Sequence, residues 1–157
     1  MDTIACLSSV EPPWVYLAVL KSDEPLPDLE AALPGFVIRR IDGKRCRTKE
    51  ALLAEFARAL DFPDYFGGNW DALEECLGDL EWLPAAGYVV IVGDADLVLP
   101  GQDEEFETLV SILQEAGRAW ATPQSGAGPP RPFHVLFTVT PSQEKSRADW
   151  KMSVLRL

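Results

Sequence analysis

Apolar residues recur with two different periods along this chain of 157 residues, and their alternation predicts an α/β fold. Short runs rich in β-branched and aromatic residues predict strands at 14–20, 36–41, 88–92 and 133–139. Apolar residues at helical spacing predict helices over 49–60, from 70 to about 80, and over 103–121. Strands that alternate with helices indicate βαβ crossovers, so we expect a small parallel or mixed sheet packed by helices.

Capping and breaking residues set the limits of these elements. Thr48 and Asn69 are suited to cap the first two helices through their side-chain oxygens. Pro63 ends the first helical run, and the glycine pair before Asn69 redirects the chain. We therefore place residues 61–69 in a loop that leads directly into the second helix.

The segments that flank the central pattern are less regular. Residues 21–35 form a proline-rich connector that has room for one helical turn at 28–33, and residues 123–132 form a Gly/Pro loop. The pattern leaves open whether 152–157 adds an edge strand. We expect an N-terminal extension at 1–35, a central domain at 36–140 and a C-terminal tail at 141–157.

The helix that begins near residue 70 has two chemically different faces. On a helical wheel, Leu73, Cys76, Leu77 and Leu80 share one side, whereas Asp71, Glu74 and Glu75 share the other. An acidic face of this kind is most often simply solvated. Here, however, it carries no lysine or arginine at i±3 or i±4, so its charges repel one another instead of pairing.

Aromatic residues precede that acidic face in the loop. We expect Phe66 and Trp70 to lie in the core. Tyr65 fits two interpretations: a core residue with its hydroxyl at the edge, or an exposed aromatic of the kind found beside charges in binding surfaces. The position of its side chain decides between them.

The distribution of charge points to the kind of partner. Between Ala59 and Gly117 there is no lysine or arginine but there are fourteen carboxylates, while the whole chain has a net charge of −11. Nucleic acids and anionic membranes repel such a surface. A one-signed field instead attracts oppositely charged molecules and speeds their encounter, so we expect a basic protein partner and no direct nucleic-acid or membrane contact.

A longer motif spans the loop and the acidic helix. Residues 62–77 read Phe-Pro-Asp-Tyr-Phe-Gly-Gly-Asn-Trp-Asp-Ala-Leu-Glu-Glu-Cys-Leu. This stretch resembles the signature of the barstar family, the intracellular inhibitors of ribonucleases of the barnase type. The flanking strands and helices fit the same resemblance over roughly residues 36–140.

The resemblance implies a three-stranded parallel sheet packed by helices, to which residues 14–20 would add an N-terminal strand extension. It also implies that the acidic helix and the loop before it occupy a ribonuclease active site, where carboxylates stand in place of RNA phosphates. Carried over by motif position, the partner-binding residues are Tyr65, Asp71, Glu74, Glu75 and Glu115. The helical wheel places Glu115 opposite the apolar stripe of its own helix, where it should be exposed.

The sequence departs from the family pattern in the acidic helix. Glu75 stands where the family has its most important aspartate, and Glu74 stands where the family has a tryptophan. A Thr-x-Trp-Val stretch is replaced by residues 78–81, Gly-Asp-Leu-Glu. The acidic charge of the helix is kept, but the shape of its surface differs from the family pattern. We therefore expect the target to be a basic nuclease or toxin other than barnase.

Other residues are of the types used in catalysis and metal binding. Asp94 and Asp96 follow a strand at the edge where α/β proteins bind ligands, and could hold Mg²⁺, although such Gly-Asp-Ala-Asp turns are common in plain loops. His134 is more typical of a core imidazole than of a base, and Cys76 should be an inert buried thiol. No serine, cysteine or lysine is accompanied by a base and an orienting group.

These observations favour a non-catalytic protein with no cofactor and no metal. Three cysteines that fit neither a zinc site nor a disulfide framework, and the lack of a basic leader or a membrane-length apolar run, favour a cytoplasmic location. We expect a monomer that inhibits a basic ribonuclease or related toxin. Two alternatives stay open: a regulatory or scaffold module for another basic protein, and a Mg²⁺-dependent hydrolase.

Overall fold

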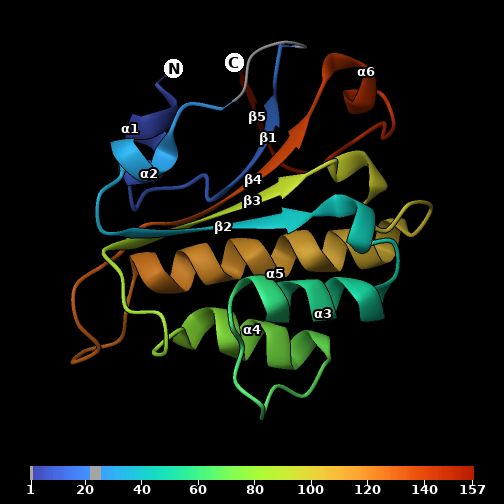
Figure 1. The fold of residues 1–157 in the computed structure, drawn as a ribbon. Coiled ribbons are helices and arrows are strands. Elements are labelled where there is room, and N and C mark those ends of the chain that lie inside the picture. Colours follow the sequence, from blue (N-terminus) through green and yellow to red (C-terminus); the bar gives the residue numbers. More distant parts are fainter. Residues whose placement is uncertain (1, 22–25) are drawn as a thin grey trace.

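A parallel sheet of five strands runs through the centre of the computed structural model, which describes residues 2–21 and 26–157 (Figure 1). Its order is β2-β3-β4-β1-β5, and every neighbouring pair is parallel. The strands are β1 Val15–Val19, β2 Phe36–Asp42, β3 Gly87–Gly93, β4 Phe133–Val139 and β5 Ser153–Arg156.

The expectation of a three-stranded sheet was wrong. β1 pairs with β4 along its whole length, from Val15 beside Val135 to Val19 beside Val139, and β5 pairs with the outer edge of β1. All five residues of β1 are buried, because β1 is an inner strand covered on both sides. Strands from before residue 36 and after residue 140 therefore belong to the same sheet as the central ones, and the segment at 152–157 does add an edge strand.

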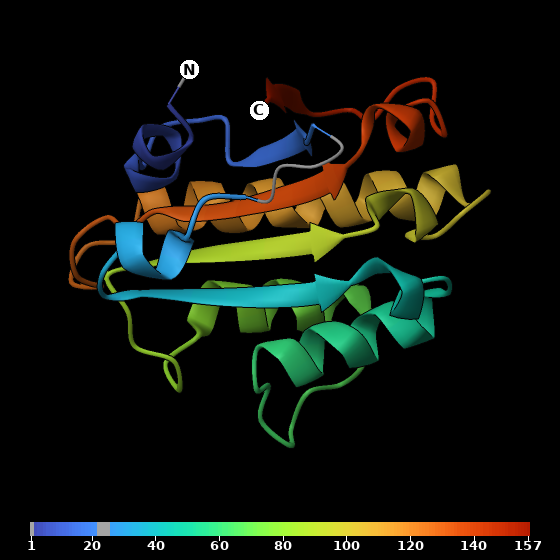
Figure 2. The same cartoon turned by 45° about the horizontal axis from the view of Figure 1, so that its top comes forward.

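Helices cover the two faces of the sheet unequally (Figures 1 and 2). The longer helices lie on one face: α3 Lys49–Ala59, α4 Trp70–Asp79 and α5 Asp103–Ala121. On the other face lie α1 Thr3–Ser8 and α2 Leu29–Ala32. The remaining helical elements are α6 Pro141–Glu144 and two 3₁₀ turns, η1 Gly43–Arg45 and η2 Ala95–Leu97.

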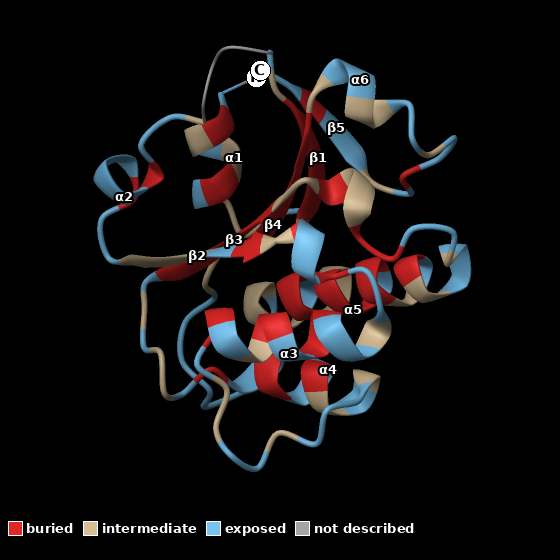
Figure 3. Ribbon diagram, turned by 45° about the vertical axis from the view of Figure 1, so that its right-hand side comes forward, coloured by how far each residue is buried: buried red, intermediate tan, exposed pale blue. Residues whose placement is uncertain are grey.

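The strands divide the core in two by their alternation. In β4, Phe133, Val135 and Phe137 point to the side of α3, α4 and α5, whereas His134 and Leu136 point to the side of α1 and α2. The first side holds the larger apolar cluster. Figure 3 shows that the inner strands β1, β3 and β4 are buried, whereas the edge strands β2 and β5 and the outer sides of the helices are partly exposed.

The sequence pattern predicted most of these elements correctly. α5 and β4 begin and end where expected, and the predicted caps are confirmed, because Thr48 accepts a hydrogen bond from the Ala51 amide and Asn69 accepts one from the Ala72 amide. α1 and α6 were not predicted, since each is too short to show an apolar period. In the connector expected at 21–35, residues 22–25 lie outside the described part of the chain.

Two helical glycines differ sharply in their surroundings. A Cβ atom added at Gly117 would lie 2.3 Å from the Cβ of Trp14, so the lack of a side chain lets α5 approach the segment that leads into β1. A Cβ atom added at Gly78 of α4 would meet no atom within 4 Å. Only the first glycine is required by packing in the free protein.

We expect Gly117→Ala to destabilise the protein although alanine favours helices by about 1 kcal/mol over glycine. Displacing α5 from Trp14 should cost about 1–3 kcal/mol, as overpacking does elsewhere. Gly78→Ala is the matched control and should stabilise the fold by up to about 1 kcal/mol. Chemical denaturation of both variants checks this, and a Gly117→Ala protein as stable as the Gly78→Ala protein would contradict the packing of α5 on Trp14.

Candidate functional site: the acidic face of α4

Apolar and tryptophan side chains anchor helix α4 to the rest of the protein. Leu73 and Leu77 are fully buried. The Trp70 indole N–H donates to Glu105 of α5 at 3.0 Å, and the Trp120 indole N–H donates to the Leu77 carbonyl at 2.8 Å. These contacts fix α4 against α5 near both of its ends without using the carboxylates of α4.

The loop before α4 is supported by an aromatic cluster. The ring of Phe62 lies 4.9 Å from that of Phe66 and 6.1 Å from that of Trp82, both in edge-on geometry. The Trp82 indole N–H donates to the Leu60 carbonyl. Phe66 and Trp70 are half-buried and pack against the main apolar cluster, close to the expectation that they lie in the core.

Tyr65 is the aromatic residue of this loop that points outward, with 69% of its surface exposed. This decides between the two interpretations left open by the sequence. The next residue, Phe66, belongs to the aromatic cluster, and its amide donates to the Pro63 carbonyl at 3.0 Å, which fixes the turn that contains Tyr65. Partial desolvation and the negative charge of Asp79 raise the pKa of the Tyr65 hydroxyl.

Three carboxylates form a row along α4. Asp71, Glu75 and Asp79 follow one another at intervals of four residues, and all three are exposed. Glu74, the residue before Glu75 in the sequence, is also exposed. None of these four acids takes part in an ion pair with a residue that the structure describes.

Asp79 is the member of this row that the motif did not supply. The sequence could have indicated that Asp79 belongs to the row, because a residue four positions after Glu75 lies only about 40° from it on the helix. Tyr65, Glu75 and Asp79 line one cleft of about 110 Å³. The floor of the cleft includes Cys76, which is buried as expected, and burial raises the pKa of its thiol.

Glu74 lies on the other side of α4, toward α5. It lines an open depression of about 730 Å³ together with Glu104, Glu107 and Glu115. The structure therefore gathers four of the five predicted residues into two groups, with Tyr65 and Glu75 on the loop side of α4 and Glu74 and Glu115 on the α5 side. The fifth, Asp71, is exposed one turn before Glu75 and is not among the residues that line these two hollows.

Glu115 differs from the other predicted residues because it is paired within the chain. Glu115 was expected to be exposed, and the structure shows it half-buried. Its side chain is 44% exposed, and Arg118 one turn later donates to both of its oxygens, through Nε at 2.8 Å and through Nη2. That hydrogen bonding lowers the pKa of Glu115. Arg118 lies just outside the stretch without bases, and its i,i+3 spacing from Glu115 is a local signal from which the pair could have been predicted.

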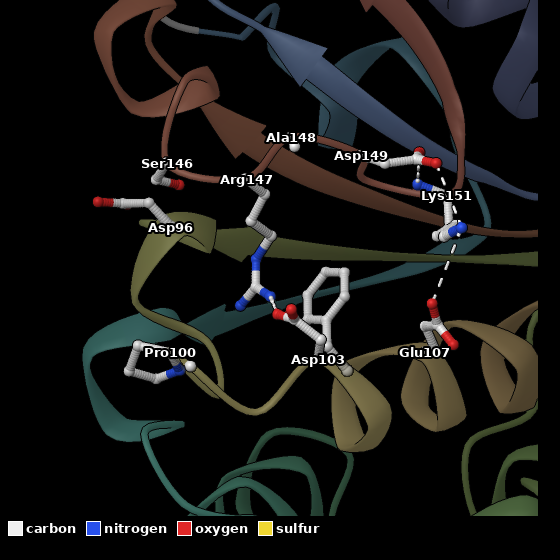
Figure 4. Close-up of a pocket in the computed structure, with 11 residues that line it drawn as sticks. Asp96, Pro100, Asp103, Glu107, Ser146, Arg147, Ala148, Asp149 and Lys151 are labelled. Carbon is white, nitrogen blue, oxygen red and sulfur yellow. Dashed lines mark hydrogen bonds and ion pairs between the residues drawn. The ribbon is translucent and has the colours of Figure 1, made fainter.

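Elsewhere, acids of the same stretch are neutralised by bases from other parts of the chain. Asp61 pairs with Arg39 at 2.9 Å, and Glu107 lies 3.8 Å from Lys151. Asp103 lies 3.6 Å from Arg147, whose guanidinium is 3.8 Å from the centre of the Phe106 ring and donates to the Val98 carbonyl (Figure 4). The depression around Arg147 has a volume of about 470 Å³. Most of the charged side chains that line it pair with one another, Arg147 with Asp103 and Lys151 with Glu107 and Asp149.

The geometry at Asp94 and Asp96 gives little support to a magnesium site. Asp94 lies 3.9 Å from Lys44 and accepts a hydrogen bond from Gln143 at 3.3 Å. Within residues 2–21 and 26–157, no three His, Cys, Asp or Glu side chains cluster as metal ligands would. Among the same residues, no helix has both the length and the apolar character needed to cross a bilayer.

Comparison with known proteins agrees with the motif. The sequence model of the family described as Barstar (barnase inhibitor) matches residues 36–138, about two thirds of the chain. The chain belongs to the barstar family. A search of curated proteins gives no match.

We expect the Glu115–Arg118 pair to reduce the contribution of Glu115 to binding a basic partner. Glu115→Gln in the native chain should change affinity by less than about threefold, since Arg118 already engages the carboxylate and an exposed pair is worth at most about 1 kcal/mol. In an Arg118→Gln background, the same change should weaken binding more. Titration of the four proteins of this double-mutant cycle with a hexa-arginine peptide measures the difference, and additive effects would contradict it.

Proposed function

We propose that this protein is an intracellular, non-catalytic inhibitor of a basic ribonuclease or a related basic toxin. In this proposal α4 and the loop before it enter the anion-binding active site of the enzyme and exclude its substrate. Asp71 and Glu75 would accept charge-assisted hydrogen bonds from arginine, lysine or histidine side chains, Tyr65 would supply apolar contact, and Glu74 and Glu115 would lie at the rim.

The observation that carries this proposal is the set of unpaired carboxylates on a well-anchored helix. Each like-charged pair at i,i+4, as between Asp71 and Glu75 or Glu75 and Asp79, costs about 0.2–0.5 kcal/mol. Asp79 also lies at the negative end of the helix dipole, where an acid is unfavourable by a further few tenths of a kcal/mol, and α4 has no base in its last turn. The helix dipole favours Asp71 in the first turn, but the repulsion within the row and the position of Asp79 reduce the stability of the free protein. A cationic surface that covers the row would remove this cost.

Membership of the barstar family supports a ribonuclease as the target, and the local differences support a target other than barnase. Glu75 is one methylene longer than the family's aspartate, so its carboxylate reaches further from the helix axis. Asp79 adds a second carboxylate to the cleft that Tyr65 and Glu75 line. A partner complementary to this face needs a cationic group opposite each of these two carboxylates.

We expect Asp71→Asn and Glu75→Gln each to weaken binding to the inhibited ribonuclease by roughly 10- to 150-fold, because a hydrogen bond to a charged group contributes about 1.5–3 kcal/mol. The loss should appear mainly as faster dissociation. The matched control is Glu11→Gln, which removes one exposed carboxylate from the segment before β1. Inhibition and surface-binding assays against a panel of microbial ribonucleases measure the effect, and equal affinity for all four proteins would falsify the assignment of Asp71 and Glu75.

Association with the ribonuclease should slow as salt rises. The carboxylates of α4 are exposed, and ions screen exposed charges over a Debye length that falls from about 10 Å at 0.1 M to about 3 Å at 1 M. Stopped-flow measurement over that range should show a steep fall in the association rate and a smaller change in the dissociation rate. An association rate that does not respond to salt would contradict electrostatic steering.

A regulatory or scaffold module that binds a different basic protein would use the same face. Affinity capture from a lysate separates the two functions, because a ribonuclease or toxin should dominate the captured proteins and lose its activity in the complex. A captured basic protein without nuclease activity would favour the scaffold function.

A further inference from the structure

The N-terminal segment, residues 2–11, covers part of the sheet face that lies opposite α3, α4 and α5 (Figures 1 and 3). Its helix α1 buries Leu7 completely, in an apolar cluster with Tyr16, Val89 and Leu136. Most other residues of the segment are exposed or half-exposed. A small number of contacts therefore holds this segment on the apolar cluster that contains Leu7, which we call the second core.

One of those contacts is made by His134, the single histidine of the chain. Its side chain on β4 has 0% exposure, and its Nε2 atom lies 2.6 Å from the Ser9 carbonyl oxygen. Because a carbonyl only accepts, Nε2 must carry the proton and donate it. The other nitrogen, Nδ1, is buried with no hydrogen-bond partner among the described residues, which fits a neutral ring whose unprotonated nitrogen faces the core.

The surroundings of His134 offer no counter-charge for a second proton. From β1, the Tyr16 ring lies 6.1 Å away, and burial raises the pKa of Tyr16 to about 12, so its hydroxyl is neutral. From α1, Cys6 lies beside Tyr16, and from β3 the residue in register is Val89. No ion pair of the described chain includes His134.

We propose that protonation of His134 releases the N-terminal segment from the sheet, so that the second core opens in acid while the α4 face keeps its structure. A proton on Nδ1 would place a charge in a fully buried site where backbone groups of Pro13 and Trp14 offset only part of the cost of burial, so the charge is better stabilised by water or a new partner. Lifting the segment that contains Ser9 admits water beside β4. Moving β4 itself would break its ladders with both β1 and β3, so local release is the cheaper route.

The sign of the pH dependence follows from the burial of the ring. Burial lowers the pKa of His134, and the backbone groups of Ser9, Trp14 and Pro13 offset part of this lowering. A group whose pKa is lowered on folding leaves stability intact above its ordinary pKa and reduces it as pH falls below that value. The attachment of the segment is therefore complete at neutral pH and weakens as the medium becomes mildly acidic.

Amide hydrogen exchange measured by mass spectrometry tests the proposal directly. Between about pH 7.5 and about pH 5.5, a range in which histidine is the side chain that ordinarily titrates, peptides from residues 2–11 should lose protection at least severalfold after correction for the intrinsic rate. Peptides from α4 and α5 should not. Unchanged protection of residues 2–11, or an equal loss throughout the chain, would overturn the proposal.

The variant His134→Gln supplies the matched control, because its amide nitrogen can donate to Ser9 as Nε2 does but does not titrate. Its N-terminal segment should keep the same protection at both pH values, and a loss like that of the native protein would contradict the role of His134. Should the variant fail to fold, NMR of the native chain is sufficient, since a single histidine gives one imidazole signal. A titration midpoint at or above the ordinary histidine value would also overturn the proposal.

Discussion

The attachment of α4 through groups other than its acids is the constraint on which the rest of the candidate site depends. A row of like charges destabilises a helix slightly, so the helix must be held by something else if those charges are to remain free. Buried leucines and the indole N–H groups of Trp70 and Trp120 provide that attachment. Because the anchors lie on one side and the carboxylates on the other, the charged face needs no internal partner and can be rigid before a ligand arrives. Rigidity of this kind lowers the entropy lost on binding.

The sheet separates two parts of the molecule that differ in character. One face supports three long helices and, through them, the acidic surface. The other face is covered by two short helices and contains the buried imidazole of His134. Since the strands between them are inner strands with ladders on both sides, a change on the second face does not have to disturb the first. Partner binding and the attachment of the N-terminal segment can therefore vary separately.

Much of the fold followed from local pattern. The long helices and inner strands have clear periods, and their caps use side chains that act within three residues, as Thr48 and Asn69 do. The number of strands in the sheet did not follow, because pairing of β1 with β4 joins residues more than a hundred positions apart. No local signal specifies which edge of a sheet a separate strand will choose. The short helices α1 and α6 were missed for a different reason, since a helix of fewer than two turns is too short to show an apolar period.

For the candidate site, the sequence by itself determined which residues carry charge, that the helix separates them from its apolar side, and that the stretch from Ala59 to Gly117 supplies no base of its own. Helical geometry is local and makes these features predictable. Only the tertiary structure decided that Tyr65 points outward, that Asp79 joins the cleft beside Glu75, that Glu115 is occupied by Arg118, and that bases from distant segments neutralise Asp61, Asp103 and Glu107. Whether a carboxylate is free depends on what the rest of the chain places within a few ångströms of it, and that is set by packing between elements rather than by order along the chain.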